Sequence, residues 1–238
     1  KDKVFGRISD YGMLGSGYIY PVFNTIDTLI ELPVWAECVC YRSFINALKM
    51  EKLLCNDNLV YINHSTFKDH VNLNTVVLNN GLESIGLRAF LDTHLTEIVI
   101  PDSVTYVGAG AFSWVTTLER VKMSSSIQSI DEYCFNNCKS LMKIDIPESC
   151  KVIESDAFTS CNFEEINLPN GLERIGNKVF SCCSRLRQVV IPDSCQILVD
   201  DIFRNCDSLA KLELPRQYRG VNVRDITEVQ FEIRKQSK

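Results

Sequence analysis

Eleven cysteines are the residues of this chain best suited to chemistry, because a thiolate can bind a metal, attack an electrophile or form a disulfide. Four of them, Cys138, Cys161, Cys183 and Cys206, recur every 22 or 23 residues. Zinc needs four ligands that converge in a tetrahedron, whereas this even spacing predicts a line of sulfur atoms. Disulfides between neighbouring repeats stay open, although an odd number leaves at least one thiol unpaired. We expect most cysteines to act as small buried hydrophobic residues.

Three histidines, His64, His70 and His94, lie close together in the sequence and could bind a metal or transfer protons. No C-x-x-C pair accompanies them, and the chain contains no G-x-S-x-G, H-E-x-x-H or G-x-x-x-x-G-K-S/T motif. We therefore expect these histidines to occupy surface and turn positions. The sequence predicts no catalytic residue, no bound metal and no cofactor, so the protein is not expected to be an enzyme.

The cysteine spacing belongs to a longer repeat that must position every other residue. A fixed period of about 20 to 29 residues is typical of a solenoid, in which each unit contacts mainly its neighbours. One continuous array is therefore expected. The clearest marker is phenylalanine, which recurs at Phe44, Phe67, Phe90, Phe112, Phe135, Phe158, Phe180 and Phe203.

Aligned on these phenylalanines, each unit reads L-x-x-I-x-I-P-x-S-V-x-x-I-G-x-x-A-F-x-x-C. The I-x-I alternation predicts a short strand, and the S-V-x-x-I portion predicts a second extended piece. The A-F-x-x-C portion predicts one helical turn or a tight bend. Two repeats have lost a residue just before Leu95 and Phe163, which identifies that stretch as a loop and leaves the apolar positions intact.

The two ends depart from the repeat. Residues 1–22 are expected to form an N-terminal cap, 23–215 the array with one worn repeat and about eight clear ones, and 216–238 a C-terminal cap. Residues 229–233 alternate like an edge strand and precede three basic residues. Charged residues of this kind prevent an exposed edge from pairing with another chain.

The repeat unit resembles that of the BspA-like branch of the leucine-rich repeat superfamily. Residues 100–104 read I-P-D-S-V, and Ala89-Phe90, Ala111-Phe112 and Ala157-Phe158 carry the second half of the signature. The resemblance implies a curved right-handed solenoid, mainly β with short helical turns, that has a parallel sheet on one face and is used for binding. It also implies a cell-surface or secreted adhesin, although many free cysteines leave a reducing compartment open.

Composition and net charge limit only the class of partner that the protein can bind. A net charge of −5 and a pI near 5.3 disfavour nucleic acid, and no run of about 18 apolar residues predicts a membrane-spanning helix. The chain starts at Lys1 without the hydrophobic core of a signal peptide, which does not decide the compartment. We expect a protein or glycan partner, and either a monomer or a subunit of an assembly.

The outward positions of the predicted strands carry the candidate binding site. Leu54, Val77 and Val99 fall between the inward positions and would form an apolar patch on the sheet surface. Two alternatives stay open, in which the N-terminal segment covers the patch or sheet propensity alone selected valine. Trp35 and Trp114 are further candidates, for which core or cap packing is the stronger expectation. The patch is ringed by Lys52, Glu97, Arg120 and Lys122.

The leading hypothesis is a non-enzymatic interaction module that binds through the sheet face. An alternative is a structural subunit of a larger assembly that uses the same face. A weaker alternative is a metal-loaded or redox-active thiol protein.

Overall fold

The computed structural model describes residues 18–19, 26–41, 43–198 and 201–218. Apart from residues 18–19 and 216–218, the predicted caps at 1–22 and 216–238 lie outside the described residues. The edge strand predicted at 229–233 does so too.

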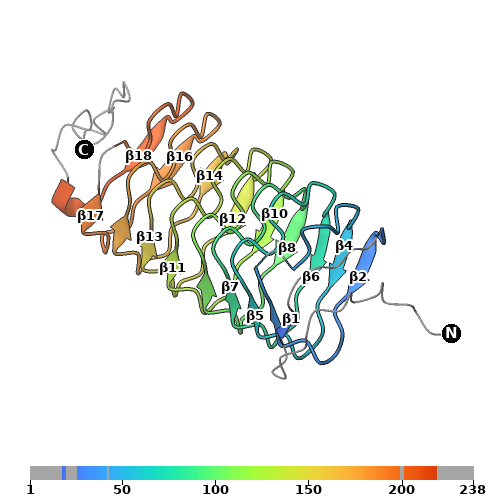
Figure 1. Cartoon of the computed structure of the whole chain (residues 1–238). Coiled ribbons are helices and arrows are strands. Elements are labelled where there is room, and N and C mark those ends of the chain that lie inside the picture. The colour runs from blue at the N-terminus through green and yellow to red at the C-terminus, as the bar shows by residue number, and fades with distance from the viewer. Residues whose placement is uncertain (1–17, 20–25, 42, 199–200, 219–238) are drawn as a thin grey trace.

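The chain forms a parallel β-solenoid, which confirms the predicted fold (Figure 1). Each coil supplies one strand to a wide face and one short strand to a narrow face, and every strand pair is parallel. A single 3-10 turn, Arg216–Tyr218, follows the last coil. The wide face carries β2 (Leu29–Glu31), β4 (Lys52–Leu54), β6 (Thr75–Val77), β8 (Glu97–Val99), β10 (Arg120–Lys122), β12 (Lys143–Asp145), β14 (Glu165–Ile166), β16 (Gln188–Val190) and β18 (Lys211–Glu213). The narrow face carries β1 (Tyr18–Ile19), β3 (Cys38–Val39), β5 (Tyr61–Ile62), β7 (Ser84–Ile85), β9 (Tyr106–Val107), β11 (Ser129–Ile130), β13 (Val152–Ile153), β15 (Arg174–Ile175) and β17 (Ile197–Leu198).

Strand register places equivalent residues of successive repeats side by side. Val121 pairs with Ile98 on one side and Ile144 on the other. In β8, β10 and β12 the middle residue is buried and both flanking residues are exposed, as alternation along a strand requires. Each apolar column of the sequence therefore becomes a continuous row inside the solenoid.

The wide face is divided into three sheets, because no strand pairing joins β6 to β8 or β12 to β14 among the described residues. Both β8 and β14 directly follow a shortened loop. The apolar positions do survive the deletion, since Leu95 and Phe163 are fully buried. A loop that is one residue shorter thus keeps the core but interrupts the strand ladder. The narrow face divides once, between β9 and β11, where the repeat has its usual length.

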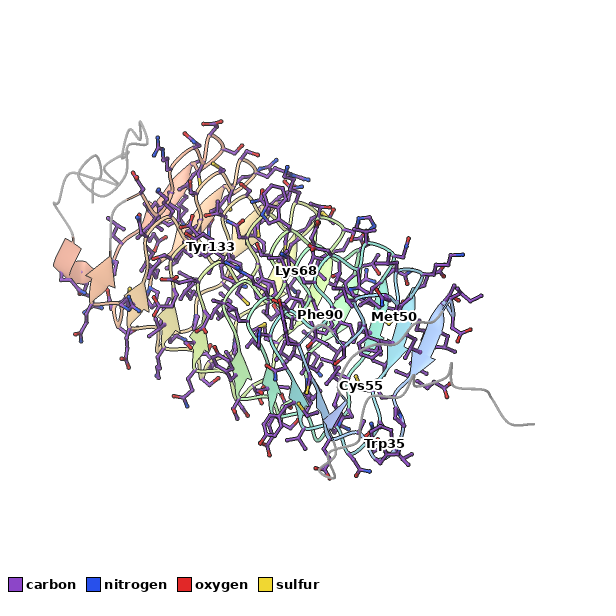
Figure 2. All side chains as sticks on the ribbon, viewed as in Figure 1. Trp35, Met50, Cys55, Lys68, Phe90 and Tyr133 are labelled. Carbon is purple, nitrogen blue, oxygen red and sulfur yellow. The ribbon has the colours of Figure 1, made fainter. Side chains whose placement is uncertain are left out.

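Phenylalanine rings stack from coil to coil through the core of the solenoid. Figure 2 labels one of them, Phe90. All eight ring-bearing side chains of the column are fully buried. Neighbouring ring centroids lie 5.1–5.9 Å apart, and most ring planes are nearly parallel. Aromatic pairs at such distances stabilise a folded protein by about 0.5–1.5 kcal/mol more than the burial of their surface area alone does. Each ring therefore stabilises both of its neighbours.

The segment around each phenylalanine is a bend made of linked turns, which is the second of the two predicted forms. Backbone N–H groups of Tyr133, Phe135 and Asn137 donate to carbonyl groups of the next coil at 3.1, 2.8 and 2.8 Å. In all the other coils between Ser65 and Cys182, the same three positions donate wherever a bond is described. All of these bonds run from one coil toward its C-terminal neighbour. A third row of backbone hydrogen bonds thus joins the coils on the bend side.

This bend has a left-handed backbone twice in each repeat from that of Phe67 to that of Phe203. The residues with φ between 51° and 65° lie two positions before or two positions after a phenylalanine. Asn and Asp adopt this region with little strain, whereas aromatic side chains do not. The set comprises Ser65, Asp69, Arg88, Asp92, Gly110, Trp114, Tyr133, Asn137, Asp156, Ser160, Lys178, Cys182, Asp201 and Asn205.

Removal of one ring from the middle of the stack is expected to destabilise the array strongly. Phe135→Ala deletes a buried side chain with stacked neighbours on both sides, so we expect a loss of about 3–5 kcal/mol. The free energy of unfolding from urea denaturation measures this. The exposed Met142→Ala serves as control and should change stability by less than about 0.5 kcal/mol. Equal midpoints for the two variants would contradict the role of the stack.

Glycine should be tolerated in the bend and costly in the strand. Tyr133 (φ 57°) and Tyr106 of β9 are 47% and 48% exposed, so they form a matched pair. Tyr133→Gly relieves a strain of about 1–2 kcal/mol, which offsets the entropy that glycine loses on folding. Tyr106→Gly has no such gain and should lose about 1 kcal/mol. Thermal unfolding of both variants tests this, and a greater loss for Tyr133→Gly would refute it.

Candidate functional site

Leu54, Val77 and Val99 lie at the ends of three successive strands of the wide face, and we call them the sheet-face patch. Leu54 pairs in register with Val77, and β8 follows β6 as the next coil. Val77 is 49% exposed and Val99 is 56% exposed, whereas Leu54 is half-buried. The structure therefore presents two of the three predicted apolar side chains to solvent.

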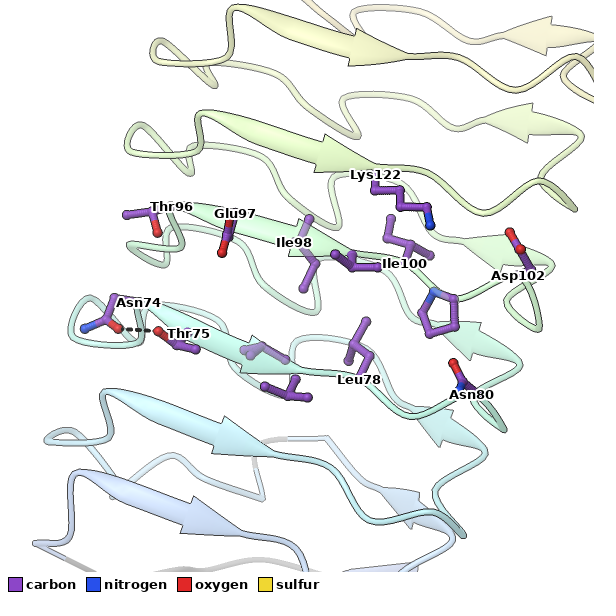
Figure 3. A pocket seen from close by; sticks show the side chains of 14 residues that line it. Asn74, Thr75, Leu78, Asn80, Thr96, Glu97, Ile98, Ile100, Asp102 and Lys122 are labelled. Atoms are coloured by element: carbon purple, nitrogen blue, oxygen red, sulfur yellow. Dashed lines mark hydrogen bonds between the residues drawn. The ribbon is translucent and has the colours of Figure 1, made fainter.

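A depression of about 430 Å³ lies over the interrupted ladder between β6 and β8 (Figure 3). Val77 and Val99 line it from the two strands. Amide side chains of Asn74 and Asn80 border it on the side of β6, and Lys122 borders it from β10. The hollow therefore combines an apolar floor with a polar rim. The two 22-residue spacings are the sequence signal that could have located it, because β8 follows the first of the shortened loops.

Charged residues around the hollow differ in whether they have partners. Arg120 Nη2 lies 2.9 Å from Glu97 Oε2, and both side chains are well exposed. Lys52 and Lys122 form no ion pair with any residue of the described part of the chain. Asp102 accepts a hydrogen bond from the Ser125 backbone N–H at 2.8 Å, which lowers its pKa, and the charge of Lys122 adds a smaller effect. Lys52 and Lys122 therefore flank the patch without forming an ion pair among the described residues, and the Asp102 carboxylate lies near enough to Lys122 to be influenced by its charge.

The structure brings only some of the seven predicted site residues together at the hollow. Val77, Val99, Glu97 and Lys122 line the hollow. Arg120 reaches it only through its ion pair with Glu97, while Lys52 and Leu54 lie on β4 beyond its edge. The alternative in which the N-terminal segment covers the patch concerns residues 1–22, of which the structure describes only 18–19.

Both tryptophans are more exposed than expected. Trp114 is half-exposed at a left-handed position of the bend, so core packing is wrong for this residue. Trp35 is also exposed and lies at the periphery of the array (Figure 2). Neither residue lies at the sheet-face patch.

The four cysteines of the repeating column are hydrogen-bond donors inside the core. The thiols of Cys138, Cys161 and Cys183 each donate to the carbonyl of a phenylalanine in the preceding coil at 3.2 Å. Cys206 does the same at 2.9 Å. His70 occupies the same position of an earlier coil, and its Nε2 lies 2.7 Å from the Phe44 carbonyl. Cysteine and histidine therefore replace each other here as donors.

This environment suppresses thiolate chemistry. Burial raises the pKa of Cys206 to about 12 and that of Cys55 to about 12, far above the range in which a thiolate forms at neutral pH. No disulfide links any of the eleven cysteines, all of which the structure describes. Within the described ranges, no group of three or more His, Cys, Asp or Glu side chains is placed to hold a metal ion.

The histidines do not form a cluster with a shared task. His64 is exposed and its ring stacks on Tyr41 with centroids 4.6 Å apart. His94 is exposed as well. His70 is buried, so the expectation of a surface position is wrong for this residue, whose ring hydrogen-bonds to the Phe44 carbonyl inside the core.

No helix among the described residues is long and apolar enough to cross a membrane.

Comparisons with known proteins agree with this architecture. A leucine-rich repeat protein from Bacteroides ovatus has a similar structure, with a TM-score of 0.57 and 24% identity over 79% of this chain, which spans 60% of that protein. The leucine-rich repeat protein of T. pallidum gives a TM-score of 0.55 and 26% identity, with 70% of this chain and 71% of that one covered. No curated protein sequence matches the chain significantly.

The family model of the BspA type leucine rich repeat region matches residues 24–119 and 108–232 in six copies. These matches cover nearly the whole array, including all the strands of the wide face from β2 to β18. The chain therefore belongs to the BspA-type leucine-rich repeat family.

Proposed function

We propose that this protein is a non-enzymatic interaction module that binds a protein or glycan partner through the sheet-face patch. The family to which it belongs, and the solenoid itself, support the general role of an interaction surface. The finer version of the proposal is an adhesin that is secreted or located at the cell surface, and this version depends on the family resemblance alone.

One observation carries the proposal: the exposed valines coincide with the hollow. The wide face farther along is charged, with Lys143 beside Asp145 and Lys211 beside Glu213. Between β6 and β8, exposed apolar side chains line a depression on this face. An apolar centre with a polar rim is the usual composition of a protein interface.

The thiol alternative has little support. A redox or metal-binding thiol must reach the thiolate state, whereas the four-cysteine column is buried and engaged with backbone carbonyls. The structural-subunit alternative uses the same patch and differs in the partner. Oligomeric mass that stays constant on dilution would favour it over binding of a separate partner.

Charge placed on the valines should abolish partner capture. In pull-downs from the native source, we expect Val77→Glu/Val99→Glu to retain at least about tenfold less partner than wild type, because charge in an interface centre is severely unfavourable. Val77→Thr/Val99→Thr keeps the branched side chains and tests apolarity alone. Val190→Glu is the matched control, since Val190 is 43% exposed in the same column of the wide face. Equal capture by all variants would refute the proposed site.

The cysteines should remain inert until the protein unfolds. Cys182 is the exposed cysteine of the chain and should react first with a thiol reagent. The buried thiols should react only in denaturant, where all eleven become accessible. A spectrophotometric titration of native and unfolded protein measures this, with Cys182→Ser as control. Rapid reaction of several thiols in the native Cys182→Ser protein would restore the redox alternative.

A further inference from the structure

We infer that the sheet-face patch binds an extended acidic polypeptide segment in which an aliphatic side chain is flanked on both sides by carboxylates. This inference rests on the proposed function and names the chemistry of its partner. It follows from the position of the unpaired cations relative to the hollow.

Lys52 and Lys122 lie at opposite margins of the apolar strip. Lys52 is on β4 and Lys122 is on β10, with β6 and β8 and their exposed valines between them. Neither ammonium has an ion-pair partner among the described residues, whereas Arg120 is paired with Glu97. A partner that covers the valines also removes water from these two charges, so it must supply carboxylates to compensate.

The geometry suits an extended chain that crosses the strands. Three strand spacings, about 14 Å, separate β4 from β10, and Lys52 also lies two residues along the strand from the row of Lys122, so the two positions are about 16 Å apart. Residues i, i+2 and i+4 of an extended chain point to one side and span about 13 Å. Acidic side chains at i and i+4 would meet Lys52 and Lys122, because the long flexible lysine side chains cover the remaining distance. The aliphatic side chain at i+2 would enter the hollow between Val77 and Val99.

A second copy of this chain fits the same face poorly. A symmetric dimer needs a two-fold axis in the interface, so that each residue meets a defined partner of the other copy. With the axis along the strands, between β6 and β8, Lys52 faces Arg120 of the second copy. With the axis across the strands, Arg120 faces Lys122. Like charges in contact disfavour either arrangement.

A neutral glycan lacks the negative charges that would compensate Lys52 and Lys122. Sugar hydroxyl groups can accept hydrogen bonds from Lys52 and Lys122, but they carry no negative charge. The exposed apolar floor and the two cations together match a side-chain triplet of the form acid–aliphatic–acid. We therefore assign a polypeptide partner.

Selection from a displayed library of random linear peptides tests the assignment. The folded wild-type protein is the target, and the enriched peptides are then measured for binding to Val77→Glu/Val99→Glu. We expect enriched sequences to carry Asp or Glu two positions before and two positions after Leu, Ile or Val. A synthetic peptide of the enriched sequence should bind about tenfold more weakly to Lys122→Glu, and more weakly at high salt. Lys211→Glu, at the far end of the same face, should bind as wild type does.

Each other outcome overturns the inference in a distinguishable way. Peptides that depend on Val77 and Val99 but lack the acidic pair would refute the acidic partner and leave the proposed function intact. Peptides that bind Val77→Glu/Val99→Glu as tightly as wild type would refute the proposed function itself. No enrichment, together with glycan binding that Val77→Thr/Val99→Thr abolishes, would assign the face to a sugar. A dimer that dissociates on dilution and is lost in that variant would assign it to a second copy.

Discussion

Everything in this protein depends on contact between one coil and the next. A single coil holds two short strands, one bend and one phenylalanine, too little apolar surface to offset the entropy of ordering about 23 residues. Strand pairing on two faces, the row of bend hydrogen bonds and the ring stack all operate between coils. Their common spacing forces each repeat to keep the same inward side chains and confines a change of length to a loop.

The constraint also explains how the fold produces an irregular surface. The core tolerates loss of a residue from a loop, because Leu95 and Phe163 still reach their rows. The strand ladder does not tolerate it, and β8 and β14 lose their pairing with the preceding strand. At β8 this interruption coincides with outward valines on both sides, and the result is a hollow. The loss of one loop residue thus produces a shaped feature on the described wide face.

The sequence predicted the parts of the structure that obey the period. The solenoid, the buried phenylalanines and the inward columns follow from residue type and spacing. The bend was foreseen only as one of two forms, because its alternating left-handed positions accept Asp, Asn and Ser but also Trp114 and Tyr133. The hollow could not be predicted from residue types, since it lies where the pairing between β6 and β8 is interrupted. His70 was misplaced because its role as a donor to Phe44 becomes visible only when neighbouring coils are stacked.

The row of hydrogen bonds on the bend side gives the solenoid a net dipole along its axis. Its inter-coil N–H groups all point toward the C-terminal end, whereas those of an α-helix point toward the N-terminal end. Peptide dipoles of about 3.5 D that align in this way add along the array. The C-terminal end of the bend side is therefore its positive pole, and the N-terminal end its negative pole. A solenoid built of near-identical coils consequently has chemically unlike ends, and negative charge is favoured near its last coil rather than near its first.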